Sequence, residues 1–204
     1  MFSHKKFSVA INIYEEIKLK KISMDSIVFV CAIRAAGYCR PWEYTMSLLD
    51  QSYELFNEDP KSIINIANTA MTNLKYIEIT AKVKSYSHKS VFQKCEDILQ
   101  WMIKKDINPS EQTMDIFLAV TCTHGSIEDC EIALKRRFEW NINPTIFTFN
   151  TLLNRCSTHG LVSQADKILE EMNKWGIDQD STTFNTRLKL FVNINDYGSA
   201  MKGI

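Results

Sequence analysis

The sequence predicts an all-α fold, a solenoid of helical hairpins that repeats every 35 residues. Identities recur at that interval, apolar residues make up 45% of the 204 positions, and the chain has only 6 glycines and 4 prolines. A period of this length indicates stacked two-helix units that bury their apolar faces against one another. The recurring residues are Thr113, Thr148 and Thr183, with the pairs His124/His159, Gly125/Gly160, Trp140/Trp175, Phe149/Phe184 and Asn150/Asn185.

The second helix of each hairpin carries a small residue at its centre and, in most cases, a bulky apolar residue four positions later. Both lie on the stripe that a packed helix buries. The pattern predicts second helices at 6–20, 42–55, 92–104, 127–139 and 162–174. The small residues are Ala10, Thr45, Cys95, Cys130, Ala165 and Ala200.

The first helices are delimited by proline and glycine. Asn-Pro at 108–109 and 143–144 separates hairpins, because proline does not continue a helix and the residue before it avoids the α region. Gly125 and Gly160 are expected to end first helices in the left-handed conformation. First helices are therefore predicted near 28–37, 113–123, 148–158 and 183–193.

These elements divide the chain into three parts. Residues 1–60 hold degenerate hairpins, and residues 76–204 hold repeats at 76–110, 111–145 and 146–180 with a partial repeat at 181–204. Between them, residues 61–75 break the register. The stretch 61–87 contains neither glycine nor proline, so one long helix and an extra inserted helix are both compatible with it.

Composition excludes several classes of protein. Lys and Arg total 24, Asp and Glu also total 24, and the resulting zero net charge gives no general sign of nucleic-acid binding. No two of the six cysteines form a CxxC motif, so reduced buried thiols are expected, with a disulfide framework or a zinc site as the alternatives. No apolar run is long enough to span a membrane.

The sequence contains no recognisable catalytic motif. It has no Walker loop, no glycine-rich dinucleotide fingerprint and no HExxH, and its four histidines accompany no evident nucleophile. We therefore expect a binding protein without enzymatic activity, cofactor, metal ion or small-molecule substrate.

The segment NPTIFTFNTLLNRCSTHGLVSQADKILEEMNKWGIDQD, residues 143–180, resembles a pentatricopeptide repeat. The resemblance is closest over 111–204, recognisable over 76–110 and weaker over 1–60. It implies a right-handed solenoid whose partner is RNA. It also implies a role in organellar gene expression, in mitochondria or alternatively in plastids.

The resemblance also assigns candidate RNA-binding residues. In this family the fifth and last residues of a repeat read the edge of a base, and the second packs against its face. In repeat 146–180 these residues are Asn150, Asp180 and Phe147, and the Asn/Asp pair resembles the uridine-reading combination. An amide offers a donor and an acceptor to a base, and an aromatic ring offers a stacking surface. Asn150 satisfying its local backbone and Asp180 capping the next helix are the structural alternatives.

Other candidate positions are less complete. Thr182 and Asn185 open the next repeat, and the weaker RNA-binding candidates are Thr80, Ser110, Asp115, Lys135, Arg136 and Arg137. The last three form a basic cluster near the end of a second helix, where cations also favour the helix dipole. Trp140 and Trp175 offer base stacking, but packing between repeats is the stronger interpretation.

Two functions are compatible with the sequence. The chain is either a component of a mitochondrial ribonucleoprotein such as the mitochondrial ribosome, touching rRNA and neighbouring proteins, or a single-stranded RNA-binding factor for one organellar transcript. Neutral charge and degenerate repeats favour the first, whereas the Asn150/Asp180 pair favours the second. A third possibility is the repeat region of a longer RNA-processing enzyme.

Overall fold

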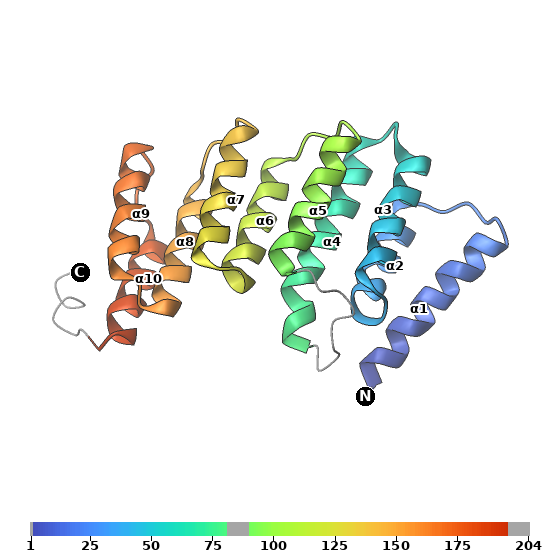
Figure 1. The fold of residues 1–204 in the computed structure, drawn as a ribbon, viewed down its shortest axis with the longest axis horizontal. Coiled ribbons are helices and arrows are strands. Elements are labelled where there is room, and N and C mark those ends of the chain that lie inside the picture. The colour runs from blue at the N-terminus through green and yellow to red at the C-terminus, as the bar shows by residue number, and fades with distance from the viewer. Residues whose placement is uncertain (1, 81–89, 196–204) are drawn as a thin grey trace. The chain divides into compact units, whose positions relative to one another are not determined.

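The computed structural model describes residues 2–80 and 90–195, and all regular secondary structure in these ranges is α-helical (Figure 1). The all-α prediction is confirmed. The chain divides into two compact units, Met1–Val120 and Thr121–Ile204. The helices of the described ranges are α1 (Phe2–Leu19), α2 (Ser26–Cys39), α3 (Trp42–Phe56), α4 (Pro60–Thr80), α5 (Val91–Lys104), α6 (Glu111–His124), α7 (Ile127–Glu139), α8 (Ile146–His159), α9 (Val162–Lys174) and α10 (Ser181–Asn193).

In the first unit, α2 is the central helix. It packs against α1, α3 and α4, and α4 in turn packs against α3 and α5. The buried ring of Phe29 meets the rings of Tyr14 and Phe56 edge-on, with centroids 5.6 and 5.8 Å away. Such edge-to-face contacts add to the stabilisation that burial provides. These three rings join α1, α2 and α3, and buried apolar residues continue along α4 and α5.

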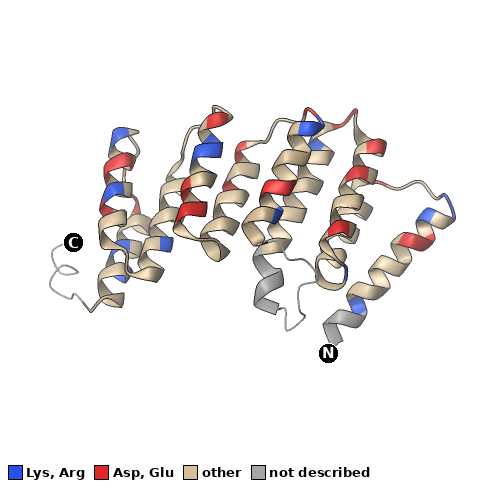
Figure 2. Ribbon diagram, viewed as in Figure 1, with Lys and Arg blue, Asp and Glu red and all other residues tan. Residues whose placement is uncertain are grey.

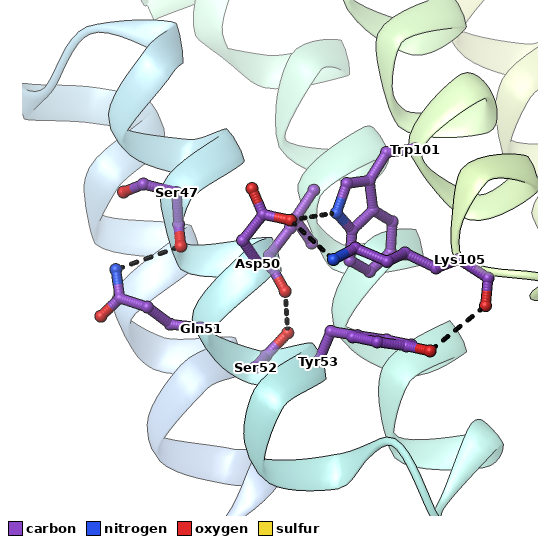
Figure 3. Close-up of polar contacts among 8 residues, drawn as sticks. Ser47, Asp50, Gln51, Ser52, Tyr53, Trp101 and Lys105 are labelled. Atoms are coloured by element: carbon purple, nitrogen blue, oxygen red, sulfur yellow. Dashed lines mark hydrogen bonds and ion pairs between the residues drawn. The ribbon is translucent and has the colours of Figure 1, made fainter.

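Two tryptophans join α3 to α5. Trp42 Nε1 donates a hydrogen bond to Asp97 Oδ2 at 2.9 Å. Trp101 Nε1 donates one to Asp50 Oδ1 at 3.0 Å (Figure 3). The two tryptophan residues are only 8% and 6% exposed. Since an ionised acceptor strengthens a hydrogen bond, the two second helices are held by charge-assisted bonds as well as by packing.

Lys105 completes this cluster. Its Nζ lies 3.3 Å from Asp50 Oδ1 and 4.5 Å from the centroid of the Tyr53 ring, while the Tyr53 hydroxyl donates a hydrogen bond to the carbonyl of Lys105 (Figure 3). Lys105, which follows Lys104 in the sequence, therefore contacts Asp50 and Tyr53 of the same protein.

The register break coincides with a single long helix, α4, of 21 residues. Pro60 supplies the pre-set φ that favours a first helical turn. Apolar residues then recur at intervals of three and four and are buried along one side: Ile63, Ile66, Ala67, Ala70, Met71 and Leu74. The hairpin that contains α5 therefore begins at Pro60, and residue 76, the predicted start of a repeat, falls near the end of α4.

The two glycines that follow first helices differ. Gly160 is left-handed, with φ of 67°, and its N–H donates to the carbonyl of Cys156, as predicted. Gly125 was expected to be left-handed too, and this prediction is wrong, because positive φ among the described glycines occurs at Gly160 and Gly176. A Cβ on Gly125 would lie 2.8 Å from the carbonyl oxygen of Thr121, so glycine is required there by a close approach of backbone.

The core of the second unit lies between α8, α9 and α10. Leu153 and Cys156 of α8, Ala165 and Leu169 of α9, and Leu190 of α10 form one buried cluster. Leu161, Val162 and Ile168 pack against its border. Ala165 is the small central residue predicted for this second helix, and Leu169 is its bulky partner four positions later, so the predicted stripe faces the core.

All six cysteines are free thiols. Cys95, Cys122, Cys130 and Cys156 are buried, Cys39 is half-buried, and Cys31 is exposed. Burial raises the pKa of the Cys156 thiol to about 11 and raises that of Cys39 above its usual value. No helix of the described ranges combines the length and the apolar character needed to cross a bilayer.

Native-state alkylation should follow this order of exposure. We expect iodoacetamide at neutral pH to modify Cys31 first, Cys39 more slowly, and the four buried cysteines only after unfolding, because the reactive species is the accessible thiolate. Peptide mass spectrometry after timed labelling measures this order. Modification of Cys95 at the rate of Cys31 in the native protein would contradict the burial described above.

The tryptophan contacts between α3 and α5 should contribute to stability. Trp42→Phe and Trp101→Phe keep an aromatic ring but remove the N–H that Asp97 or Asp50 accepts, so each should lower the free energy of unfolding by about 1 to 2 kcal/mol. Urea unfolding measures the loss. Trp175→Phe is the matched control: that tryptophan is 44% exposed, and its change should stay within about 0.5 kcal/mol. Equal effects at all three positions would refute the interpretation.

Candidate functional site

The candidate site lies in the second unit, where α8 packs on α10. Phe147 and Asn150 stand in the first turns of α8, and Asp180 immediately precedes α10. Since residues three apart share one face of a helix, Phe147 and Asn150 point to the same side of α8. Phe147 is 49% exposed, and Asn150 and Asp180 are partly exposed. The structure thus gathers the three residues of the repeat that the sequence singled out.

Asn150 and Asp180 are in direct contact. Asn150 Nδ2 donates a hydrogen bond to Asp180 Oδ1 at 3.1 Å. The Asn150 amide is held from its other end as well, because the hydroxyl of Thr183 donates to Asn150 Oδ1 at 2.7 Å. Thr183 is fully buried on the first turn of α10. One amide therefore has a fixed partner at its nitrogen and another at its oxygen.

Asp180 also caps α10. Its Oδ1 accepts a hydrogen bond from the backbone N–H of Thr183 at 2.8 Å, and the Thr183 hydroxyl accepts one from the backbone N–H of Asp180 at 3.2 Å. This reciprocal arrangement is a capping box. The capping alternative for Asp180 is thus confirmed, and the contact with Asn150 is made by the same carboxylate.

The hydrogen bonds also set the charge of the site. The backbone N–H of Thr183 contributes most to lowering the pKa of Asp180 below its usual value, followed by the Thr183 hydroxyl and the Asn150 amide. The carboxylate is therefore ionised at neutral pH and acts only as an acceptor. An ionised Asp180 favours the orientation of the Asn150 amide in which an N–H faces the carboxylate.

Sequence reasoning missed the part that Thr183 plays. Thr113, Thr148 and Thr183 mark the repeat period, and all three are fully buried at the third position of a helix. The signal that was available is the Asp-x-x-Thr spacing of 180–183, which is a helix-start motif. What the spacing does not give is the reach of the threonine hydroxyl across to the preceding hairpin.

Thr182 and Asn185 are exposed on α10. They occupy the positions of α10 that correspond to Phe147 and Asn150 of α8 in the repeat. At these positions α10 therefore exposes the hydroxyl group of Thr182 and the amide of Asn185.

The weaker RNA-binding candidates of the first unit are Thr80, Ser110 and Asp115, and the structure places each of them on or beside a helix. Ser110 Oγ lies 2.9 Å from Thr113 Oγ1 and accepts the backbone N–H of Thr113 at 3.1 Å, so it serves the start of α6. Asp115 is half-buried on α6. Thr80, the fifth residue of the predicted repeat 76–110, is the last residue of α4, because that helix begins at Pro60. The side chain of Thr80 lies outside the described residues.

The basic cluster of α7 does not form a continuous surface. Arg137 was predicted as an RNA contact, and this is wrong: it is 1% exposed and its Nε donates to the carbonyl of Asn143 at 3.0 Å. It lies on the inward stripe of the helix together with Cys130 and Ala133. Arg136 Nη1 lies 2.8 Å from Glu139 Oε2, and Lys135 is exposed.

Charge of both signs is interspersed over the helices (Figure 2). On α7, acidic Glu128 and Asp129 occupy the first turn and basic Arg136 and Arg137 the last, as the helix dipole favours. Among the described residues, no group of three or more histidine, cysteine or acidic side chains is placed to hold a metal ion.

Trp175 follows α9 and stacks on Phe138 of α7, with ring centroids 5.6 Å apart and planes 9° from parallel. The contact joins two successive second helices of the second unit. The interpretation of Trp175 as packing between repeats is thereby confirmed.

Comparison with known proteins finds one family match and a fold shared with solved structures. Residues 144–193 match the PPR repeat family. The crystal structure of the pentatricopeptide repeat protein PPR10 in complex with an 18-nt psaJ RNA element superposes with a TM-score of 0.67 over 94% of this chain, at 14% identity. A triple cysteine-to-serine variant of PPR10 with the same RNA element gives the same values.

At this identity the structural likeness shows the fold alone. The chain spans 26% of the length of PPR10. No curated protein matches the chain. The match of residues 144–193 to the PPR repeat family and the fold shared with PPR10 over 94% of the chain agree with the 35-residue repeat pattern.

Proposed function

We propose that the chain binds single-stranded RNA through Phe147, Asn150 and Asp180, as the RNA-contacting part of a mitochondrial ribonucleoprotein such as the mitochondrial ribosome. The observation that carries RNA binding is the direct contact between Asn150 and Asp180 beside an exposed aromatic ring. The structural likeness to PPR10 in complex with RNA supports the same proposal.

The chemistry of the site suits one nucleotide. The ring of Phe147 offers a face for stacking, which contributes about 1–3 kcal/mol per base in single-strand binding. The amide of Asn150 offers hydrogen bonds to the edge of a base that is not paired. Asp180 is occupied by the start of α10 and by Asn150, so its part is to orient the amide.

A role within a larger particle is supported by the other candidate residues and by the charge of the chain. Ser110 is engaged at a helix start, Arg137 is buried, and the formal net charge is zero. Electrostatic attraction to phosphates normally supplies much of the affinity for nucleic acid. This chain has no net positive charge, and its described residues offer one candidate site that holds all three base-contacting positions. In a ribonucleoprotein, contacts with neighbouring proteins and rRNA would add to the affinity of that site for RNA.

The alternative is a dedicated binding factor for one organellar transcript, acting in its processing, stability or translation. The Asn150/Asp180 pair favours it, because that pair matches the family's uridine-reading combination. The two candidates differ in the RNA that the protein contacts in the organelle.

RNA binding should depend on the two exposed residues of α8. Phe147→Ala removes the stacking surface and Asn150→Ala removes the base contact, so each should weaken binding to oligouridine roughly 5- to 100-fold. Fluorescence anisotropy at fixed salt concentration measures the affinity. Asn173→Ala, at an exposed position of α9, is the matched control and should bind like the unmodified protein. The proposed site is wrong if all three variants bind equally well.

Cross-linking in fractionated organelles should separate the two candidates. We expect the protein in mitochondria, with cross-linked reads concentrated on rRNA and co-sedimentation with ribosomal particles. Reads concentrated on one messenger or precursor, lost in Asn150→Ala, would replace the ribonucleoprotein proposal by the dedicated factor. Recovery from plastids would overturn the mitochondrial assignment.

A further inference from the structure

We propose that Thr183 determines base specificity by position: its buried hydroxyl fixes the orientation of the Asn150 amide, so that the site distinguishes bases carrying a carbonyl from bases carrying an amino group. This inference rests on the proposed RNA-binding function. Thr183 itself is a positioning residue, since its side chain is fully buried and acts through Asn150.

The amide is held by two partners of different chemistry. Its nitrogen donates to the ionised Asp180 at 3.1 Å, and its oxygen accepts from the Thr183 hydroxyl at 2.7 Å. Rotating the amide by half a turn would place its oxygen against the carboxylate, where two acceptors repel. The same rotation would take the acceptor away from Thr183, so the two contacts favour the same orientation.

The Thr183 hydroxyl has a second acceptor within reach. Its Oγ1 also lies 2.9 Å from Asp180 Oδ1, while it accepts the backbone N–H of Asp180. A hydroxyl carries one hydrogen, so it serves Asn150 and Asp180 in turn or shares it between them. In both cases the side chains of Asn150, Asp180 and Thr183 are linked by hydrogen bonds to one another. Removal of the Thr183 hydroxyl removes the hydrogen bond that the Asn150 oxygen accepts.

A fixed amide presents a fixed pattern to a ligand. The side chain of asparagine has two N–H donors and two oxygen lone pairs. The contacts with Asp180 and Thr183 use one of each, which leaves one donor and one acceptor for a base. If the amide turns over, the donor and the acceptor exchange places.

The bases differ in the same respect. On the edge used for pairing, uracil and guanine carry a carbonyl beside a ring N–H, whereas cytosine and adenine carry an amino group beside a ring nitrogen that accepts. A fixed donor and acceptor fit one class and oppose the other. An amide free to turn over accommodates both, so loss of Thr183's hydroxyl should reduce discrimination more than affinity.

The test compares binding of oligouridine and oligocytidine of equal length. Both bases are pyrimidines of similar size and stacking, so the ratio of the two affinities reports the orientation of the Asn150 amide. In the unmodified protein we expect oligouridine to bind roughly 5- to 100-fold more tightly. Thr183→Val, which keeps the shape but removes the hydroxyl, leaves only Asp180 to orient the amide and should lower the ratio, and Thr183→Ser should restore it.

A matched variant controls for the helix start. Thr113 is also fully buried at the third position of a helix, and it accepts the backbone N–H of Ser110 at 3.2 Å as Thr183 accepts that of Asp180. Thr113→Val therefore removes a comparable capping contact and should leave the ratio unchanged. An unchanged ratio in Thr183→Val would overturn the proposal, as would equal loss of both RNAs without rescue by Thr183→Ser.

A second measurement needs no RNA. The side-chain amide protons of Asn150 should give a separate NMR signal that exchanges slowly with solvent in the unmodified protein and in Thr183→Ser, but exchanges faster in Thr183→Val. If this holds while the unmodified protein binds neither RNA, the proposed function fails and the positioning role of Thr183 stands. Identical exchange in all three proteins would remove the positioning role itself.

Discussion

Contact between the first helices of successive hairpins holds each unit together, and the candidate site depends on it. In the first unit α2 packs on α4, and Asn73 Nδ2 donates to the carbonyl of Ile33 at 2.9 Å. In the second unit α8 packs on α10, where Asn193 Nδ2 donates to the carbonyl of Ser157 at 2.9 Å. This packing brings Asp180 to Asn150 across 30 positions of sequence.

The groups that begin α10 are also the groups that organise the site. A helix start leaves backbone N–H groups without partners, and Asp180 and Thr183 satisfy two of them. The same oxygen atoms then reach Asn150 on the neighbouring helix. The groups that cap α10 therefore also orient the Asn150 amide.

Basic residues that cluster in the sequence do not form a basic surface in the part of the chain that the structure describes. Lys105 and Arg137 belong to basic clusters along the chain, yet Lys105 pairs with Asp50 and Arg137 is enclosed against the carbonyl of Asn143. A cation near the end of a second helix therefore serves packing and the helix dipole before it serves a partner. Lys135, one turn earlier along α7 than Glu139, remains exposed.

Outside the α4 region, the sequence by itself determined the helices and, within a few residues, their boundaries, because helix periodicity, proline and capping residues act over a few positions. Its resemblance to a pentatricopeptide repeat also singled out Phe147, Asn150 and Asp180 as candidate site residues. Gly160 followed the same local logic, whereas Gly125 did not, since the need for glycine there comes from a backbone oxygen at 2.8 Å from its missing Cβ.

Only the tertiary structure decided three matters. It extended α4 back to Pro60, where a stripe of buried residues outweighs the 35-residue register. It turned Arg137 inwards, since the rotation of α7 about its own axis is set by the helices around it. It also joined Thr183 to Asn150, because that contact depends on the separation of two helices, which a sequence pattern does not encode.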